Sequence, residues 1–142
     1  MDPLSIIAGT TGTVSFAIAS AAMLNNFINS ILDAPADIAE IARDVDALSK
    51  ILNTLQGWLE KDVIRPSAAR SLSESLNACV TSMNQLRLAI QPYTKETPSN
   101  RATLKWDSLF RWTFKRQEIR GLRDKLQHGK TTLSISISII NT

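Results

Sequence analysis

The residue types that usually carry out catalysis are scarce in this chain of 142 residues. It contains one histidine, His128, and one cysteine, Cys79, so these residues can form neither a zinc site nor an intramolecular disulfide. The spacings of a nucleophile elbow and of a P-loop are absent, and Gly9 and Gly12 do not follow a strand-like segment that would make them a phosphate cradle. We therefore expect no enzymatic activity, no metal and no cofactor.

The acidic residues are concentrated in one segment. Residues 33–62 carry seven acidic and three basic side chains. On a helix, spacings of three and four place Asp37 with Glu40, and Glu40 with Asp44, on one face, with Asp46 nearby. The simplest interpretation is a solvated face whose negative charge suits the N-terminal end of a helix.

The basic residues are concentrated near the other end of the chain, where residues 101–130 carry nine basic and three acidic side chains. The periodicity predicts an amphipathic helix here, and it also carries Trp106 and Trp112. Such a helix suits an anionic lipid surface, to which each cation contributes about 1 kcal/mol. The candidate lipid-binding residues are Arg111, Lys115, Arg116, Arg120, Arg123 and Lys125.

The basic segment has two other interpretations. Phosphates of nucleic acid attract the same side chains, but no helix-turn-helix spacing or zinc motif accompanies them, so we expect no nucleic-acid partner. The remaining alternative is a solvated helix face that is neutralised by the acidic segment, residues 33–62.

The segment Leu4–Leu32 holds no charged side chain over 29 residues. Its length would suffice for a membrane span, but its many Ser, Thr and Asn residues make it a poor permanent span. No basic residue precedes Arg43, which argues against a signal peptide. Asp2 and Pro3 fit the start of a helix. An uncharged helix of this kind is expected at the centre of a bundle, or in lipid.

Three further helices are expected from the spacing of apolar residues. Steps of three and four predict amphipathic helices from Pro35 to about Asp62 and from Pro66 to about Ile90, with Cys79 as a small core residue of the second. Residues 92–100 are expected to form a loop, and a fourth helix to begin near Thr103. The chain is thus predicted to be one all-α domain, residues 1–142, folded as an up-and-down bundle of four main helices.

The end of the fourth helix is ambiguous. Gly129 could cap it, and the alternation of isoleucine and serine in residues 133–139 has the period of a strand. A lone strand has no partner in this chain, and Leu126, Leu133 and Ile137 also fit a helical stripe. We therefore expect the helix to continue to about Ile140.

Three parts of the chain together resemble the HeLo-like N-terminal domain of fungal STAND or NLR-type proteins. These are the opening residues 1–6 (MDPLSI), the block from Asp33 to Leu55, and the segment from Leu104 to Ile139, in which a tryptophan and basic residues precede spaced leucines. The resemblance implies an all-helical bundle. It also implies a role in programmed cell death, innate immunity or heterokaryon incompatibility, with the domain cytoplasmic at rest and at the plasma membrane when activated.

In such cell-death effectors the N-terminal helix inserts into the membrane, helped by a glycine-zipper-like row of small residues. The resemblance implies a homo-oligomer on activation, anionic membrane lipids as partners, and an upstream NLR-type receptor or an attached nucleotide-binding module. The alternative it leaves open is an interaction module of such a receptor without membrane activity. The candidate membrane-insertion residues are Leu4, Ile6, Ile7, Gly9, Gly12, Thr13, Ala17 and Ala21.

Overall fold

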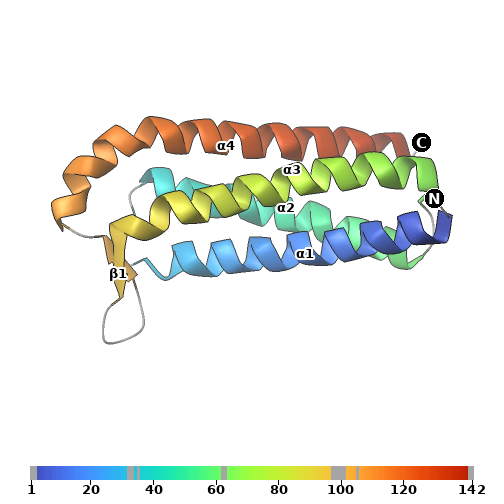
Figure 1. Cartoon of the computed structure of the whole chain (residues 1–142), viewed down its shortest axis with the longest axis horizontal. Helices are drawn as coiled ribbons and strands as arrows, with labels where there is room; N and C mark the ends of the chain where they lie inside the picture. The colour runs from blue at the N-terminus through green and yellow to red at the C-terminus, as the bar shows by residue number, and fades with distance from the viewer. Residues whose placement is uncertain are drawn as a thin grey trace.

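The computed structural model describes residues 3–31, 34, 36–61, 64–96, 102–104 and 106–140, and the side chains of residues 9–31, 34, 36–61, 64–65, 67–92 and 116–139. Four helices make up most of it, as the sequence predicts (Figure 1). They are α1 (Pro3–Asn29), α2 (Ala36–Glu60), α3 (Pro66–Ile90) and α4 (Trp106–Ile140). The expectation of a four-helix bundle is confirmed.

Successive helices run in opposite directions, so that α1 and α3 are parallel to each other, as are α2 and α4 (Figure 1). Helix α1 packs along both α2 and α3, whereas α4 packs along α3 and meets α2 over a shorter stretch. As a result α1 and α4 lie on opposite sides of the bundle. The beginning of α1 and the end of α4 lie at the same end of the molecule (Figure 1).

The core follows the predicted apolar spacing in α2 and α3. All seven stripe residues of α2, from Ile38 to Leu59, are buried, and Cys79 of α3 is fully buried among its apolar neighbours. Helix α4 adds Ile119, Leu122, Leu126 and Leu133. Burying one such side chain stabilises a fold by about 1.5–3 kcal/mol, so these stripes account for the choice of helix faces.

The connection between α3 and α4 is more ordered than the loop expected over residues 92–100. A short 3₁₀ helix, η1 (Gln91–Tyr93), leads into strand β1 (Thr94–Glu96), which pairs antiparallel with β2 (Ala102–Leu104). Thr103, where the fourth helix was expected to begin, pairs with Lys95 in this hairpin. Helix α4 therefore begins at Trp106, a few residues later than expected.

Helix α4 continues through Gly129 to Ile140, which confirms the helical alternative for the C-terminal segment and shows that Gly129 is not a cap. Serine and threonine hydroxyls there donate to carbonyls four residues earlier: Thr132 to His128, Ser136 to Thr132 and Ser138 to Ser134. These hydrogen bonds satisfy hydroxyl groups that would otherwise favour extended structure.

Helix α1 differs from the centrally buried helix that the sequence suggested. One face, including Val14, Ala17 and Leu24, is buried against α2 and α3. The opposite face is open, with Phe16 and Met23 exposed by 58% and 56%. Because α4 lies on the far side of the bundle, no helix covers this face among the described residues.

Candidate functional site

A row of ion pairs joins the acidic segment of α2 to the basic segment of α4. Arg123 donates from Nε to Asp44 Oδ2 and from Nη1 to Glu40 Oε2, each over 2.9 Å. One heptad earlier, Nε of Arg116 lies 2.8 Å from Oδ2 of Asp37. We call these five residues the charged seam. The acidic face of α2 is therefore paired across to α4, and is not the simply solvated face that was expected.

The register of the charged seam follows from helix geometry. Asp37 and Asp44 are separated by seven residues, as are Arg116 and Arg123. Seven residues are close to two turns and about 10 Å of rise, so each pair of side chains returns to the same face of its helix. Because α2 and α4 run parallel, equal spacings on the two helices bring both arginines opposite their acids (Figure 1).

The inner part of the charged seam is withdrawn from water. The side chains of Arg123 and Asp44 are exposed by 22% and 13%, whereas Arg116 in the outer pair is exposed by 44%. Burial by itself would lower the pKa of Arg123, but hydrogen bonds to Asp44 and Glu40 and their charges outweigh it and raise the pKa. Arg123 is thus held as a cation between two carboxylates, a charge-assisted arrangement stronger than a surface pair.

The other predicted lipid-binding residues are differently placed. Arg120 and Lys125 are exposed on α4. Arg111 and Lys115 belong to the same helix, but their side chains lie outside the described residues. Among the predicted lipid-binding residues whose side chains are described, α2 therefore engages Arg116 and Arg123, whereas Arg120 and Lys125 face solvent.

The predicted insertion residues all belong to α1 but do not share one environment. The side chains of Leu4, Ile6 and Ile7 lie outside the described residues. Of the others, Ala17 and Ala21 are buried, and Thr13 is half-buried and donates to the carbonyl of Gly9. Gly9 and Gly12 are exposed. A Cβ at either glycine would meet nothing within 4 Å, so neither glycine is required by a helix contact in this state.

Sequence reasoning did not identify the outer face of α1 as an exposed surface. We define this face by Gly12, Phe16, Ala19, Met23 and Asn26, which are all exposed and recur at steps of three and four. Because Leu4–Leu32 carries no charged side chain, the sequence did not distinguish this face from the buried ones. Asn26, on the same side of the helix, could have indicated this face. An asparagine inside a helix is favoured where its side chain points to solvent.

A buried polar contact holds the first half of α1 against α3. Thr10, which is 1% exposed, donates from Oγ1 to the carbonyl of Ala69 over 3.2 Å and lies 2.9 Å from Oγ of Ser73. A buried hydroxyl left without such partners costs about 1–3 kcal/mol. This contact therefore opposes removal of α1 from the bundle.

The two candidate surfaces do not meet in this state. The outer face of α1 and the basic residues of α4 lie on opposite sides of the bundle (Figure 1). A flat membrane cannot contact both surfaces of the folded bundle at once.

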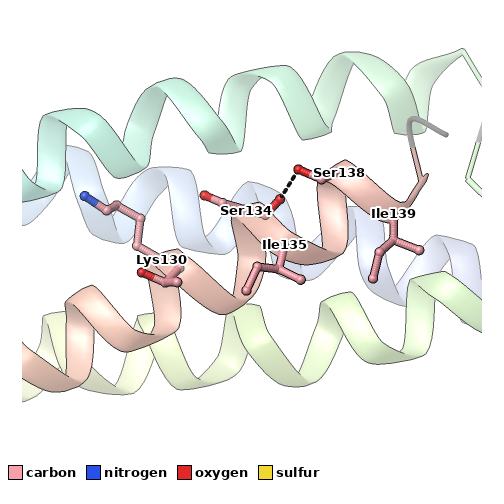
Figure 2. Close-up of a pocket in the computed structure, with 6 residues that line it drawn as sticks. Lys130, Ser134, Ile135, Ser138 and Ile139 are labelled. Carbon is pink, nitrogen blue, oxygen red and sulfur yellow. Dashed lines mark hydrogen bonds between the residues drawn. The ribbon is translucent and has the colours of Figure 1, made fainter.

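A shallow hollow lies on the last turns of α4, where Ile135 and Ile139 are exposed by 57% and 68% (Figure 2). Both isoleucines project from the same side of the helix, with Lys130 one turn before them (Figure 2). This open surface has one cation and serine hydroxyls but no acid or histidine in its lining. It offers no set of groups for catalysis.

Two general features bear on function. None of the helices in the described part of the chain combines the length and apolar character that crossing a membrane requires. Within those same residues, His, Cys, Asp and Glu form no cluster of three or more suited to a metal ion.

Comparison with known proteins gives one match. The whole chain, residues 1–142, matches a family model described as the N-terminal part of pigment biosynthesis cluster protein PigL. No curated protein matches the chain, and no solved structure does so either. The match supports the coarser expectation of a fungal N-terminal domain of the HeLo-like kind.

Proposed function

This chain belongs to the family of the PigL N-terminal domain, and on that premise we propose that it is a membrane-targeting effector domain that executes cell death. The process would be fungal innate immunity or heterokaryon incompatibility, as the resemblance to HeLo-like cell-death domains implies. The domain is cytoplasmic at rest and moves to the plasma membrane when an upstream NLR-type receptor or an attached nucleotide-binding module activates it.

The observation that carries this proposal is the character of α1. It is a helix of 27 residues without a charged side chain, and it exposes Phe16 and Met23 even while its other face is buried. Such a helix offers apolar groups to lipid, and its small residues allow a protein partner to approach closely. Gly9 and Gly12, unused in the bundle, are available for close helix packing in an oligomer.

The proposed action requires α1 to leave the bundle. In the folded state its buried face lies against α2 and α3, and the basic residues of α4 lie on the far side. In this proposal α4 first rests on anionic lipid, and α1 is then released from the bundle and enters the interface. Because no described helix is suited to cross a membrane alone, α1 acts in this proposal as an interfacial helix of an oligomer.

Dye leakage from vesicles tests the proposal. We expect the wild type to release dye from phosphatidylcholine vesicles containing phosphatidylserine, at least after forced oligomerisation through a fused dimeriser. A Phe16→Glu, Met23→Glu variant should fold normally, because both side chains are exposed at rest, but should lose leakage by tenfold or more. Charges at these positions oppose burial of the apolar side of an interfacial helix in lipid.

Leu88→Glu is the matched control, because Leu88 is exposed by 58% but lies on α3. It should leave leakage unchanged. Absence of leakage for the oligomerised wild type, or equal loss in the Leu88 variant, contradicts the proposal. Charged replacements of Ile6 and Ile7 extend the same test to the first turns of α1.

The outer face of α1 also favours a second candidate, an interaction module of a receptor without membrane activity. Phe16 and Met23 could equally pack against another protein or another copy of this chain. In that case the charged variant would lose a specific oligomer in solution, as measured by light scattering, and vesicle composition would have no effect on any property of the domain.

A further inference from the structure

We propose that the charged seam is an autoinhibitory contact, in which the acids of α2 occupy the arginines of α4 that bind anionic lipid headgroups in the active state. This inference rests on the proposed function. It assigns a role to Asp37, Glu40 and Asp44, and it identifies what must open before α4 binds lipid.

A carboxylate and a lipid phosphate compete for the same arginine. A guanidinium binds carboxylates and phosphates through the same N–H donors. Arg123 commits Nε and Nη1 to two carboxylates at 2.9 Å, and Arg116 commits Nε to Asp37 at 2.8 Å. While these contacts hold, the same donors cannot reach a lipid phosphate or carboxylate.

Opening of the charged seam would create a basic surface on α4. Arg116, Arg120 and Arg123 are spaced by four and three residues, so they share one side of α4. Arg120 is already exposed. Release of the other two from α2 would therefore give a continuous row of three guanidinium groups, of the kind that binds an anionic surface.

The packing of α4 determines whether the charged seam can open. Helix α4 is anchored mainly on α3, through buried residues such as Ile119 and Leu126, and it meets α2 over a shorter stretch. The charged seam can therefore open without removing α4 from α3. In the closed state the three carboxylates of α2 neutralise Arg116 and Arg123, so that these two cations do not attract an anionic membrane.

The test compares two variants of equal charge by co-sedimentation with phosphatidylcholine vesicles. The vesicles contain about 30% phosphatidylserine, which gives their surface a negative potential. The seam variant is Asp37→Asn, Glu40→Gln, Asp44→Asn. The matched variant is Asp46→Asn, Glu60→Gln, Glu74→Gln, whose acids are exposed and lie outside the charged seam. Each removes three negative charges.

We expect the seam variant to bind at least about tenfold more tightly than the matched variant, because two additional cations reach the surface. Adding Arg116→Gln and Arg123→Gln to the seam variant should remove that gain. Circular dichroism and thermal unfolding establish that each variant is folded. If the seam variant unfolds, Asp37→Asn alone, in the more exposed pair, should still tighten binding by a few-fold relative to Asp46→Asn.

Equal tightening in the seam and matched variants would overturn the autoinhibitory role, since net charge would then explain it, while leaving the proposed membrane action in place. A gain that survives loss of both arginines would overturn it as well. If no variant binds vesicles, the proposed membrane action fails and this inference fails with it.

Discussion

Position 129 shows how closely a single residue controls helix packing. Gly129 is buried in α4 opposite Cys79 of α3, and a Cβ at this position would lie 2.9 Å from Sγ of Cys79. That separation is too short for a carbon and a sulfur atom, so Sγ would have to rotate away or the two helices would have to move apart. Glycine therefore sets the distance between α3 and α4.

We expect Gly129→Ala to lower the free energy of unfolding by about 1–3 kcal/mol, because overpacking forces the two helices apart. The control is Gly121→Ala, in the same helix, where a Cβ meets nothing within 4 Å. That change should instead stabilise the protein by about 0.5–1 kcal/mol, since alanine is the better helix former. Urea denaturation measures both changes, and a stabilising Gly129→Ala would show that the helices adjust freely.

Burial also controls the acidity of the Cys79 thiol. Burial raises the pKa of Cys79 to about 11, from an ordinary value near 9, because the thiolate is poorly solvated in the core. The folded state therefore retains a proton that the unfolded state loses between pH 9 and pH 11. Stability contributed by this difference is present below pH 9 and is lost as the pH rises towards 11.

We expect the free energy of unfolding to fall by up to about 3 kcal/mol across this pH range from Cys79 alone. To isolate the contribution of Cys79, the measurement is the difference between the wild type and Cys79→Ala in guanidinium denaturation at each pH. The difference in stability should shrink as the pH rises. A constant difference from pH 8 to pH 11 would contradict the assigned cause.

At the scale of elements, α2 and α3 were the most predictable parts of the fold. Their apolar residues follow steps of three and four over the whole helix, and polar residues fill the other face, so the buried stripe could be read directly. Helix α1 offered no such contrast. Without charges to mark the solvated side, its exposed face is determined by which helices cover it, and that depends on the tertiary arrangement.

The last turns of α4 pose a conflict between local preference and packing. Isoleucine, serine and threonine have modest helix propensity, and their alternation has the period of a strand. Leu133 is fully buried and Ile137 packs against the core from the same helical face, whereas Ile135 and Ile139 are exposed. Packing of Leu133 and Ile137 therefore keeps this segment helical.

We expect Leu133→Ala to unfold the last turns of α4 locally, because the remaining contacts are too few to hold a weak helix former. Hydrogen exchange should show loss of protection in residues 131–140 with the rest of the bundle protected. Ile139→Ala is the control, since Ile139 is exposed by 68%, and it should preserve protection. Uniform loss of protection across all helices would instead show that this segment is part of the global unfolding unit.

At the scale of the whole molecule, the sequence offered pairing of the acidic and basic segments only as an alternative, and it did not indicate which residues meet. Acidic and basic segments were evident, yet their pairing depends on α2 and α4 running parallel at adjacent positions, although they are not consecutive in the chain. The same arrangement separates α1 from the basic residues. In the proposed mechanism, membrane binding and insertion are therefore two separate events, with release of α1 between them.

A reversible lock on α1 tests this order of events. Oγ of Thr10 and Oγ of Ser73 lie 2.9 Å apart across α1 and α3, so cysteines at both positions place their sulfur atoms close enough to form a disulfide. In a Cys79→Ala background, the oxidised Thr10→Cys, Ser73→Cys variant should bind anionic vesicles as the reduced form does, because α4 is unaffected. It should release no dye until a reductant is added.

The Cys79→Ala variant, in which Thr10 and Ser73 are unchanged, controls for any effect of the reductant. Leakage from the oxidised form at the reduced rate would show that α1 acts without leaving α3, and the insertion mechanism would then be wrong. Loss of vesicle binding on oxidation would show that release of α1 precedes contact with lipid. Retained binding with blocked leakage is the result that follows from two candidate surfaces on opposite sides of one bundle.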